Sequence, residues 1–407
     1  MRPTEPIPPT SPPPAAVPKS PSARLASIDA YRGLVMLLMM GEVLEFRQVA
    51  KALPESWLWK WLAWHQSHVA WIGCSLHDLI QPSFSFLVGV ALPFSLARRA
   101  AEGQPQWQRT LHAFGRALIL VLLGVFLRSI GKPHTYCTFE DTLSQIGLGY
   151  GFLYVLGLRS ARVQWAALGV LLVGYWLAFA LYPLPGPEFD WSKAGVKPEQ
   201  MLPGLAAHWS LNTNLAWAFD TWFLNLFPPH DWFRNNGGGY ATLSFIPTLG
   251  TMILGLIAGG WLRSERPPLA KVRWLALAGL AGLGAGWLCG VTDLCPVVKR
   301  IWTPSWVIFS GGWCFLLLAG FYLVVDVWNR RGWAFGLTVI GMNSIAAYLI
   351  AHLWEHFIRS ALPRHLGQGW YTFAGPAYAP LLLGAGVLLV EWLCLWWMFR
   401  RKIFLRV

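Results

Sequence analysis

The side chains best suited to acid–base chemistry in this sequence are a histidine and a carboxylate, His68 and Asp78. They lie ten residues apart in HVAWIGCSLHDLIQPSFSFLVGVALPFSLARR, where a long apolar segment begins. An imidazole with an ordinary pKa of about 6.5 can exchange a proton near neutral pH. Two simpler interpretations stay open. Asp78 could cap the helix that starts there, and His68 could be an interfacial residue ending the Trp-rich stretch WLWKWLAWHQSHVAW.

Asp29 and Arg32 form a second polar group, in the segment SIDAYRGLVMLLM that leads into the first apolar run. In the simpler interpretation Arg32 anchors the inner membrane interface, while Asp29 pairs with it or favours the helix N-terminus. In the functional interpretation the two residues contact an anionic cofactor from the cytosolic side.

Further polar residues lie inside or beside later apolar segments. A buried amide in hydrocarbon must find partners, so Asn343 either links helices or lines a pocket. Glu391 is an intramembrane carboxylate, which is functional by default unless water reaches it. Lys299 and Arg300 fall on a predicted outer loop, where they either contact an anionic donor or sugar or are simply solvated.

We predict no metal site. His352 and His356 occur in HLWEH, which matches the inverted zinc-protease pattern and would put both rings on one helix face, but a second zinc-ligand signal is missing. The six cysteines form no Cys-x-x-Cys pair. One disulfide among Cys74, Cys137 and Cys295 is left open.

The composition indicates that apolar helices must position these residues. Hydrophobic residues make up 55% of the chain, charged residues 13%, and the mean hydropathy is +0.44. A soluble domain carries about 25% charged residues. The 26 Trp residues, many at the ends of apolar blocks, are typical of membrane–water interfaces. The sequence therefore predicts an all-α, polytopic transmembrane bundle of about 10–11 spans.

Ten apolar segments approach the length of about 20 residues that a spanning helix needs. We place them at about 33–50, 79–97, 112–130, 143–158, 163–182, 242–262, 273–291, 305–326, 334–356 and 378–399. Residues 1–23 are rich in Pro and Ser and predict a disordered cytoplasmic arm preceding a membrane domain over 24–407. Residues 183–241 predict an ordered but irregular loop region outside the cytoplasm.

The net charge of +13 does not indicate nucleic-acid binding, because the Lys and Arg residues lie in short loops between apolar segments. There they set topology and contact anionic lipid headgroups. With an inside N-terminus, the inner segments hold 20 of the 32 Lys and Arg residues, which favours both termini in the cytoplasm. The short basic loops suggest a bacterial inner membrane.

The segments SxDxxRG and HxxWxGxxxxDLxxPxFxFxxGxxxxxS together resemble the heparan-α-glucosaminide N-acetyltransferase family and its bacterial relatives. Three further pieces match in order: YATLSFIP at Tyr240–Pro247, KRIWTPS at Lys299–Ser305 and GMNSI at Gly341–Ile345. The resemblance covers most of residues 24–356. Its most specific part is the block from His68 to Asp78.

The resemblance implies about eleven spans, acetyl-CoA as the cytosolic acyl donor, an amino-sugar or other glycan acceptor across the membrane, and a homodimer. The family's active-site histidine falls on His68, acting as base or acyl carrier, and its acid falls on Asp78. The matched segments suggest donor or acceptor contacts for six residues: Asp29, Arg32, Asn343, Lys299, Arg300 and Trp302.

Three departures from the family pattern leave other functions open. Glu42 and Val43 stand where the family's first span carries an Asn, Gln145 lies in Ser-Gln-Ile where an Arg is frequent, and His77 precedes Asp78. The alternatives are a transporter or flippase of a small or lipid-linked substrate, or a structural relative that has lost catalysis. We find no convincing repeat between the two halves of the chain, which disfavours a transporter.

Overall fold

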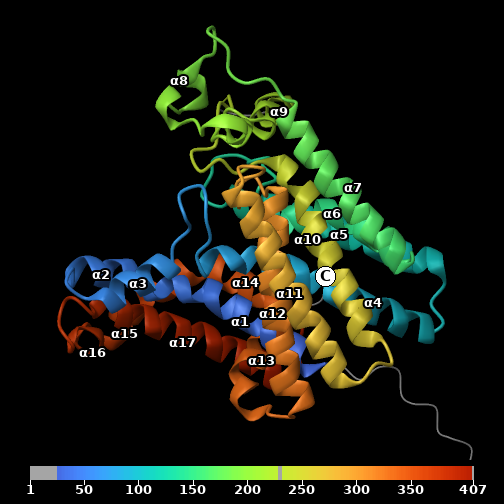
Figure 1. Ribbon diagram of the computed structural model, residues 1–407. Helices are drawn as coiled ribbons and strands as arrows, with labels where there is room; N and C mark the ends of the chain where they lie inside the picture. The colour runs from blue at the N-terminus through green and yellow to red at the C-terminus, as the bar shows by residue number, and fades with distance from the viewer. Residues whose placement is uncertain (1–24, 228–231, 406–407) are drawn as a thin grey trace, which may run out of the picture.

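A computed structural model describes residues 25–227 and 232–405. The predicted Pro-rich arm at 1–23 lies outside the described residues. Figure 1 shows a bundle of helices with an irregular region at one end. The helices that build the bundle are α1 (Ala26–Met40), α4 (Ile80–Ala101), α5 (Gln106–Ser129), α6 (Thr142–Gly157), α7 (Ala161–Ala180), α10 (Phe245–Arg263), α11 (Pro268–Val291), α12 (Pro304–Phe321), α13 (Phe335–Gly341), α14 (Ser344–Leu353) and α17 (Ala379–Arg400). Shorter helices are α2 (Phe46–Ala52), α3 (Trp57–His65), α8 (Trp191–Ala194), α9 (Leu215–Phe223), α15 (Glu355–Leu366) and α16 (Gly369–Thr372).

The all-α polytopic architecture is confirmed. Within the described residues, seven helices are long and apolar enough to cross a membrane, and the bent pair α13–α14 would make eight. Each of the ten predicted spans contains a helix or helix pair. However, α1 has 15 residues and α6 has 16, both short of the length that usually spans the hydrocarbon core.

Two predicted spans have the wrong boundaries for identifiable reasons. The first predicted span covers 33–50, but α1 ends at Met40. The chain then turns at Glu45, whose φ of 55° lies in the left-handed region. The ninth predicted span covers 334–356 as one helix, but the chain bends by 68° between α13 and α14, at Asn343. The apolar pattern continues through both turns, so it does not reveal where the helices end.

Glycine lets the central helices approach each other closely. A Cβ added at Gly255 of α10 would collide with the Phe86 carbonyl of α4, and one at Gly89 would collide with the Met252 carbonyl. The same holds where Gly341 of α13 meets the Asp29 carbonyl of α1. Backbone contact at such crossings stabilises helix pairs in a membrane, so α1, α4, α10 and α13 form a tight frame.

The region 183–241, green at the top of Figure 1, caps one end of this frame. Its described residues, 183–227 and 232–241, form short helices and turns. Trp209 is fully buried, packs beside Phe179 and accepts a hydrogen bond from the Trp71 indole at its carbonyl. The disulfide left open by the sequence is absent, because the thiols of Cys74, Cys137 and Cys295 are all free.

Candidate active site

His68 lies in the loop between α3 and α4, where Asp78 holds it. His68 Nδ1 is 2.8 Å from Asp78 Oδ1. Asp78 Oδ2 accepts hydrogen bonds from the backbone N–H groups of Val69 and Ser75 and from the Ser75 hydroxyl, at 3.0–3.2 Å. The donors all precede α4, so Asp78 closes the loop on itself instead of capping the helix. The Asp78 carboxylate is 1% exposed, whereas the His68 ring is 36% exposed.

Lys299 joins this pair from the loop between α11 and α12. Its Nζ lies 3.0 Å from His68 Nδ1 and 3.4 Å from Asp78 Oδ1, and the side chain is 5% exposed. The two loops are tied together, because Ile72 pairs with Val298 and the Gly73 N–H donates to the Val297 carbonyl. A residue 231 positions away is thus fixed beside the imidazole.

The electrostatics favour a neutral His68 ring with its proton on Nδ1. A carboxylate only accepts hydrogen bonds, so Nδ1–H donates to Asp78, and Lys299 donates to the same carboxylate. Burial lowers the pKa of His68, as do the nearby charges of Lys299 and His77, while Asp78 opposes them. Burial also lowers the pKa of Lys299 to about 8, against the attraction of Asp78. Nε2 is left as the ring's basic nitrogen.

His68 and Lys299 line a cavity of about 410 Å³. At one side its wall is apolar, formed by Met36, Met39 and Phe84 of α1 and α4. Elsewhere the wall carries charged, histidine and tyrosine side chains: Glu42, His77, Arg128, Glu140, Tyr240, Tyr348, His352 and Glu355. A volume of this size suits a small ligand. The site thus offers three imidazoles, further polar groups and an apolar part of the wall around one cavity.

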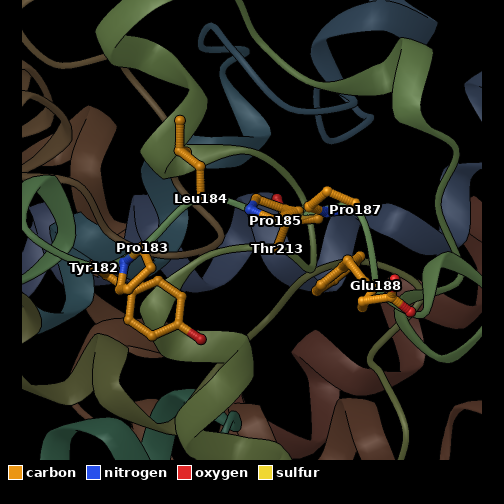
Figure 2. Close-up of a pocket in the computed structure, with 9 residues that line it drawn as sticks. Tyr182, Pro183, Leu184, Pro185, Pro187, Glu188 and Thr213 are labelled. Carbon is orange, nitrogen blue, oxygen red and sulfur yellow. The ribbon is translucent and has the colours of Figure 1, made fainter.

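A second cavity, of about 460 Å³, lies in the region 183–241 (Figure 2). Its lining residues include Pro183, Pro185 and Pro187 along one stretch of chain, and Glu188 is their one carboxylate. Neither a histidine nor a cationic side chain lines it. Of these two cavities, the one at His68 carries the histidine and cationic side chains.

Arg300 and Trp302 support the Lys299 loop rather than lining the cavity. The Arg300 guanidinium donates to the Gly238 and Val69 carbonyls, at 2.7 and 3.2 Å, and lies over the Tyr240 ring. Trp302 is 2% exposed, and its indole N–H donates to the Thr251 hydroxyl. Of these three neighbours, Lys299 is the one that reaches His68.

Asp29, Arg32 and Asn343 lie toward the opposite end of α1. Asp29 precedes Gly41 by twelve residues, about 18 Å along a helix. It forms a 3.6 Å ion pair with Arg32, as the simpler interpretation expected. Asn343 donates to the Ile403 carbonyl and accepts from the Leu405 N–H. The structure does not bring these three residues to the His68 cavity.

The most informative residues that sequence reasoning left without a role are Glu42 and Arg128. In the sequence Glu42 is only a departure from the family pattern, whereas in the structure its Oε1 lies 3.0 Å from His77 Nε2. Arg128, from α5, places a guanidinium in the cavity wall and pairs with Glu140 and Asp141 at 3.7 and 3.5 Å. Two adjacent acidic residues directly before a helix, Glu140 and Asp141, could have drawn attention in the sequence. Nothing in the sequence indicates that Arg128, at the end of the preceding helix, pairs with them.

Gln145, which stands where the family pattern frequently has an Arg, binds backbone carbonyl groups. Its side-chain amide donates to the Phe139, Ala241 and Thr242 carbonyls, so it joins the start of α6 to the loop that precedes α10. Arg128 thus supplies a guanidinium from a different helix in the part of the cavity near α6.

The His352–His356 motif does not form the continuous helix face that its spacing predicted. α14 ends at Leu353 and α15 begins at Glu355. His352 lines the cavity, and its Nδ1 hydrogen-bonds to the Tyr348 carbonyl. The described residues contain no group of three or more His, Cys, Asp or Glu side chains arranged to hold a metal ion.

Comparison with known proteins finds two similar acetyltransferases. No family model matches the chain. It is 22% identical over 378 residues to human heparan-α-glucosaminide N-acetyltransferase, covering 82% of this chain and 53% of the human protein. It is 21% identical over 383 residues to the mouse enzyme of the same name, covering 83% and 55%. The chain is a divergent relative of these acetyltransferases.

The heparan-α-glucosaminide N-acetyltransferase relationship agrees with the resemblance carried by the motifs. This chain spans about half the length of the curated relatives it matches. Together with the seven apolar helices, the relationship identifies an integral membrane protein.

Proposed function

We propose that this chain is a membrane acyltransferase that moves an acyl group, acetyl in the simplest case, from cytosolic acyl-CoA to a sugar amine or hydroxyl outside the cytoplasm. The observation that carries the proposal is the group His68–Asp78–Lys299, in which a partly exposed imidazole in the wall of a 410 Å³ cavity contacts a buried carboxylate and a buried ammonium group. The two acetyltransferase relatives supply the reaction class.

The required chemistry suits a neutral imidazole. As an amine or hydroxyl attacks a thioester, it must lose a proton, and His68 Nε2 can accept it. Alternatively, Nε2 takes the acyl group first and passes it on. In both routes the ring becomes positively charged, and Asp78, which accepts the hydrogen bond from Nδ1–H, stabilises that charge. The depressed pKa of His68 keeps the free ring unprotonated and ready at neutral pH.

The cavity walls suit an acceptor and an acyl group side by side. The apolar recess beside Met36, Met39 and Phe84 offers a place for an acyl chain. Arg128, Glu140 and the neighbouring tyrosines can hydrogen-bond a polyhydroxylated acceptor. In this proposal Asp29 and Arg32 face the cytoplasm at the other end of α1, where the coenzyme part of the donor would first bind. Both chain termini then lie on that side of a bacterial inner membrane.

A transporter is the second candidate, favoured by the bent pair α13–α14. Transporters build substrate sites from broken helices in the membrane. At this break, however, the Asn343 amide is already occupied by the Ile403 and Leu405 backbone groups. If transport is the function, substrate should enter vesicles without any acyl donor.

The deciding experiment is acyl transfer by purified chain in lipid nanodiscs, with radiolabelled acetyl-CoA and a panel of amino sugars and neutral glycans. We expect transfer that falls by about 10³-fold in His68→Ala, a loss within the range of a missing general base. His365→Ala changes an exposed histidine outside the cavity and serves as the control. Undiminished transfer in the His68 variant would reject the assigned role.

A further inference from the structure

Two of the departures from the family pattern meet in space. His77 and Glu42 come from different segments, the turn before α4 and the turn after α1, and His77 Nε2 lies 3.0 Å from Glu42 Oε1. Both residues line the same cavity as His68. The unusual histidine and the unusual carboxylate are therefore one feature, a second histidine–carboxylate pair.

The second pair lies against the first. The His77 and His68 rings are 4.6 Å apart between centroids and tilted by 52°. His77 is 6% exposed, so it is held in place, whereas the Glu42 side chain is 58% exposed. The other charged or titratable groups of the cavity wall are Arg128, Glu140, Tyr240, Lys299, Tyr348, His352 and Glu355. Among these, Lys299 contacts His68 and Asp78, so the two pairs have different electrostatic surroundings.

We propose that His77, oriented by Glu42, is the proton carrier of a two-step transfer in which His68 carries the acyl group. This rests on the proposed acyltransferase function and deepens it. An imidazole bearing an acyl group on Nε2 and a proton on Nδ1 has no free nitrogen left to act as a base. A second base must then take the proton of the acceptor, and His77 is the histidine whose ring lies against His68.

The two steps balance without any further reactant. In the first, His68 Nε2 attacks the thioester carbonyl carbon and a C–N bond forms. The C–S bond breaks, and the sulfur keeps the electron pair and takes a proton from protonated His77. In the second, the acceptor nitrogen or oxygen attacks the acyl carbon and gives its proton to His77. The C–N bond then breaks, its electron pair returns to Nε2, and both rings regain their starting states.

The test is to trap the acyl group on the protein. Three versions of the full chain are prepared in nanodiscs: wild type, His77→Gln and Glu42→Gln. Each is mixed with radiolabelled acetyl-CoA and acceptor. After acid quenching, the label bound to the protein and the labelled product are measured. In His77→Gln we expect product formation to fall by about 10²-fold while label stays on the protein, because a thiolate can leave without taking a proton but the acceptor cannot attack readily without losing one. That label should vanish in the His68→Ala/His77→Gln double variant. Glu42→Gln should shift both readouts in the same direction by a smaller factor, and its partly exposed side chain makes misfolding less of a concern.

The outcomes separate the two proposals. Wild-type product rates in both His77→Gln and Glu42→Gln would overturn the role of the second pair, as would slow turnover without retained label. If the wild-type chain transfers nothing from any acyl donor, the acyltransferase function itself fails before the variants are compared. His365→Gln controls for the loss of a histidine outside the cavity.

Discussion

The two ends of α1 place polar side chains in opposite circumstances. At its start, polar groups are satisfied by fixed partners: Asp326 accepts from the N–H groups of Ala26 and Ser27, and Asn343 binds the Ile403 and Leu405 backbone. Beyond its end, His68 pairs with Asp78 and His77 pairs with Glu42, and His68, His77 and Glu42 line a cavity. A buried polar group whose partner is backbone holds the fold, whereas side-chain pairs beside a cavity remain free to exchange protons.

The largest effect expected from this contrast is at Asp78. Asp78→Asn leaves one acceptor oxygen where Asp78 uses two, for His68 on one side and for Val69 and Ser75 on the other, and it leaves buried Lys299 without a counter-charge. We expect acyl transfer to fall by about 10³-fold and the chain to lose on the order of 3 kcal/mol of stability. Transfer assays and thermal unfolding in nanodiscs measure the two effects. A variant that is destabilised but fully active would make Asp78 a fold residue like Asn343.

Lys299 sharpens the same contrast through pH. Burial is the main cause that lowers the pKa of His68, and the positive charge of Lys299 lowers it further. In Lys299→Met the pKa of His68 should rise, so the ring is protonated at higher pH and the acid limb of the kcat–pH profile moves upward. Lys60→Met removes an exposed cation of α3 and should leave the profile in place. A downward shift, or none, would show that Lys299 does not tune the ring.

The sequence could foresee the His68–Asp78 pair because ten residues of one loop connect them. Lys299 stands out in the sequence as a cation in a predicted outer loop, although most Lys and Arg residues lie in the inner segments. Its contact with His68 could not be predicted, since the two residues are 231 positions apart. The sequence could flag Glu42 and His77 as departures, but not that they meet, because no local periodicity relates the two turns. Asn343 was grouped with the binding residues because the partner of an amide cannot be read from its surrounding sequence.

Asn343 tests the other end of the comparison. Asn343→Leu removes two hydrogen bonds to the Ile403 and Leu405 backbone and leaves those groups unpaired. We expect a loss of about 2 kcal/mol in stability and little change in kcat or in KM for acyl-CoA. Unfolding temperature and steady-state kinetics on the same preparation separate the effects. A raised KM at unchanged stability would instead assign Asn343 to donor binding.

The smallest effect lies in the capping region, at Asp220. Burial raises the pKa of this carboxyl from about 3.8 to about 7, although the Thr242 N–H donates to it. The folded chain therefore binds this proton more tightly than the unfolded chain, so the stabilisation is complete below about pH 4 and is lost as the pH rises to 7. Asp220→Asn should remove that slope and unfold at a higher temperature than wild type at pH 8 but not at pH 4, in tryptophan fluorescence melts. Equal pH slopes in the two proteins would mean that Asp220 stays ionised in the folded chain.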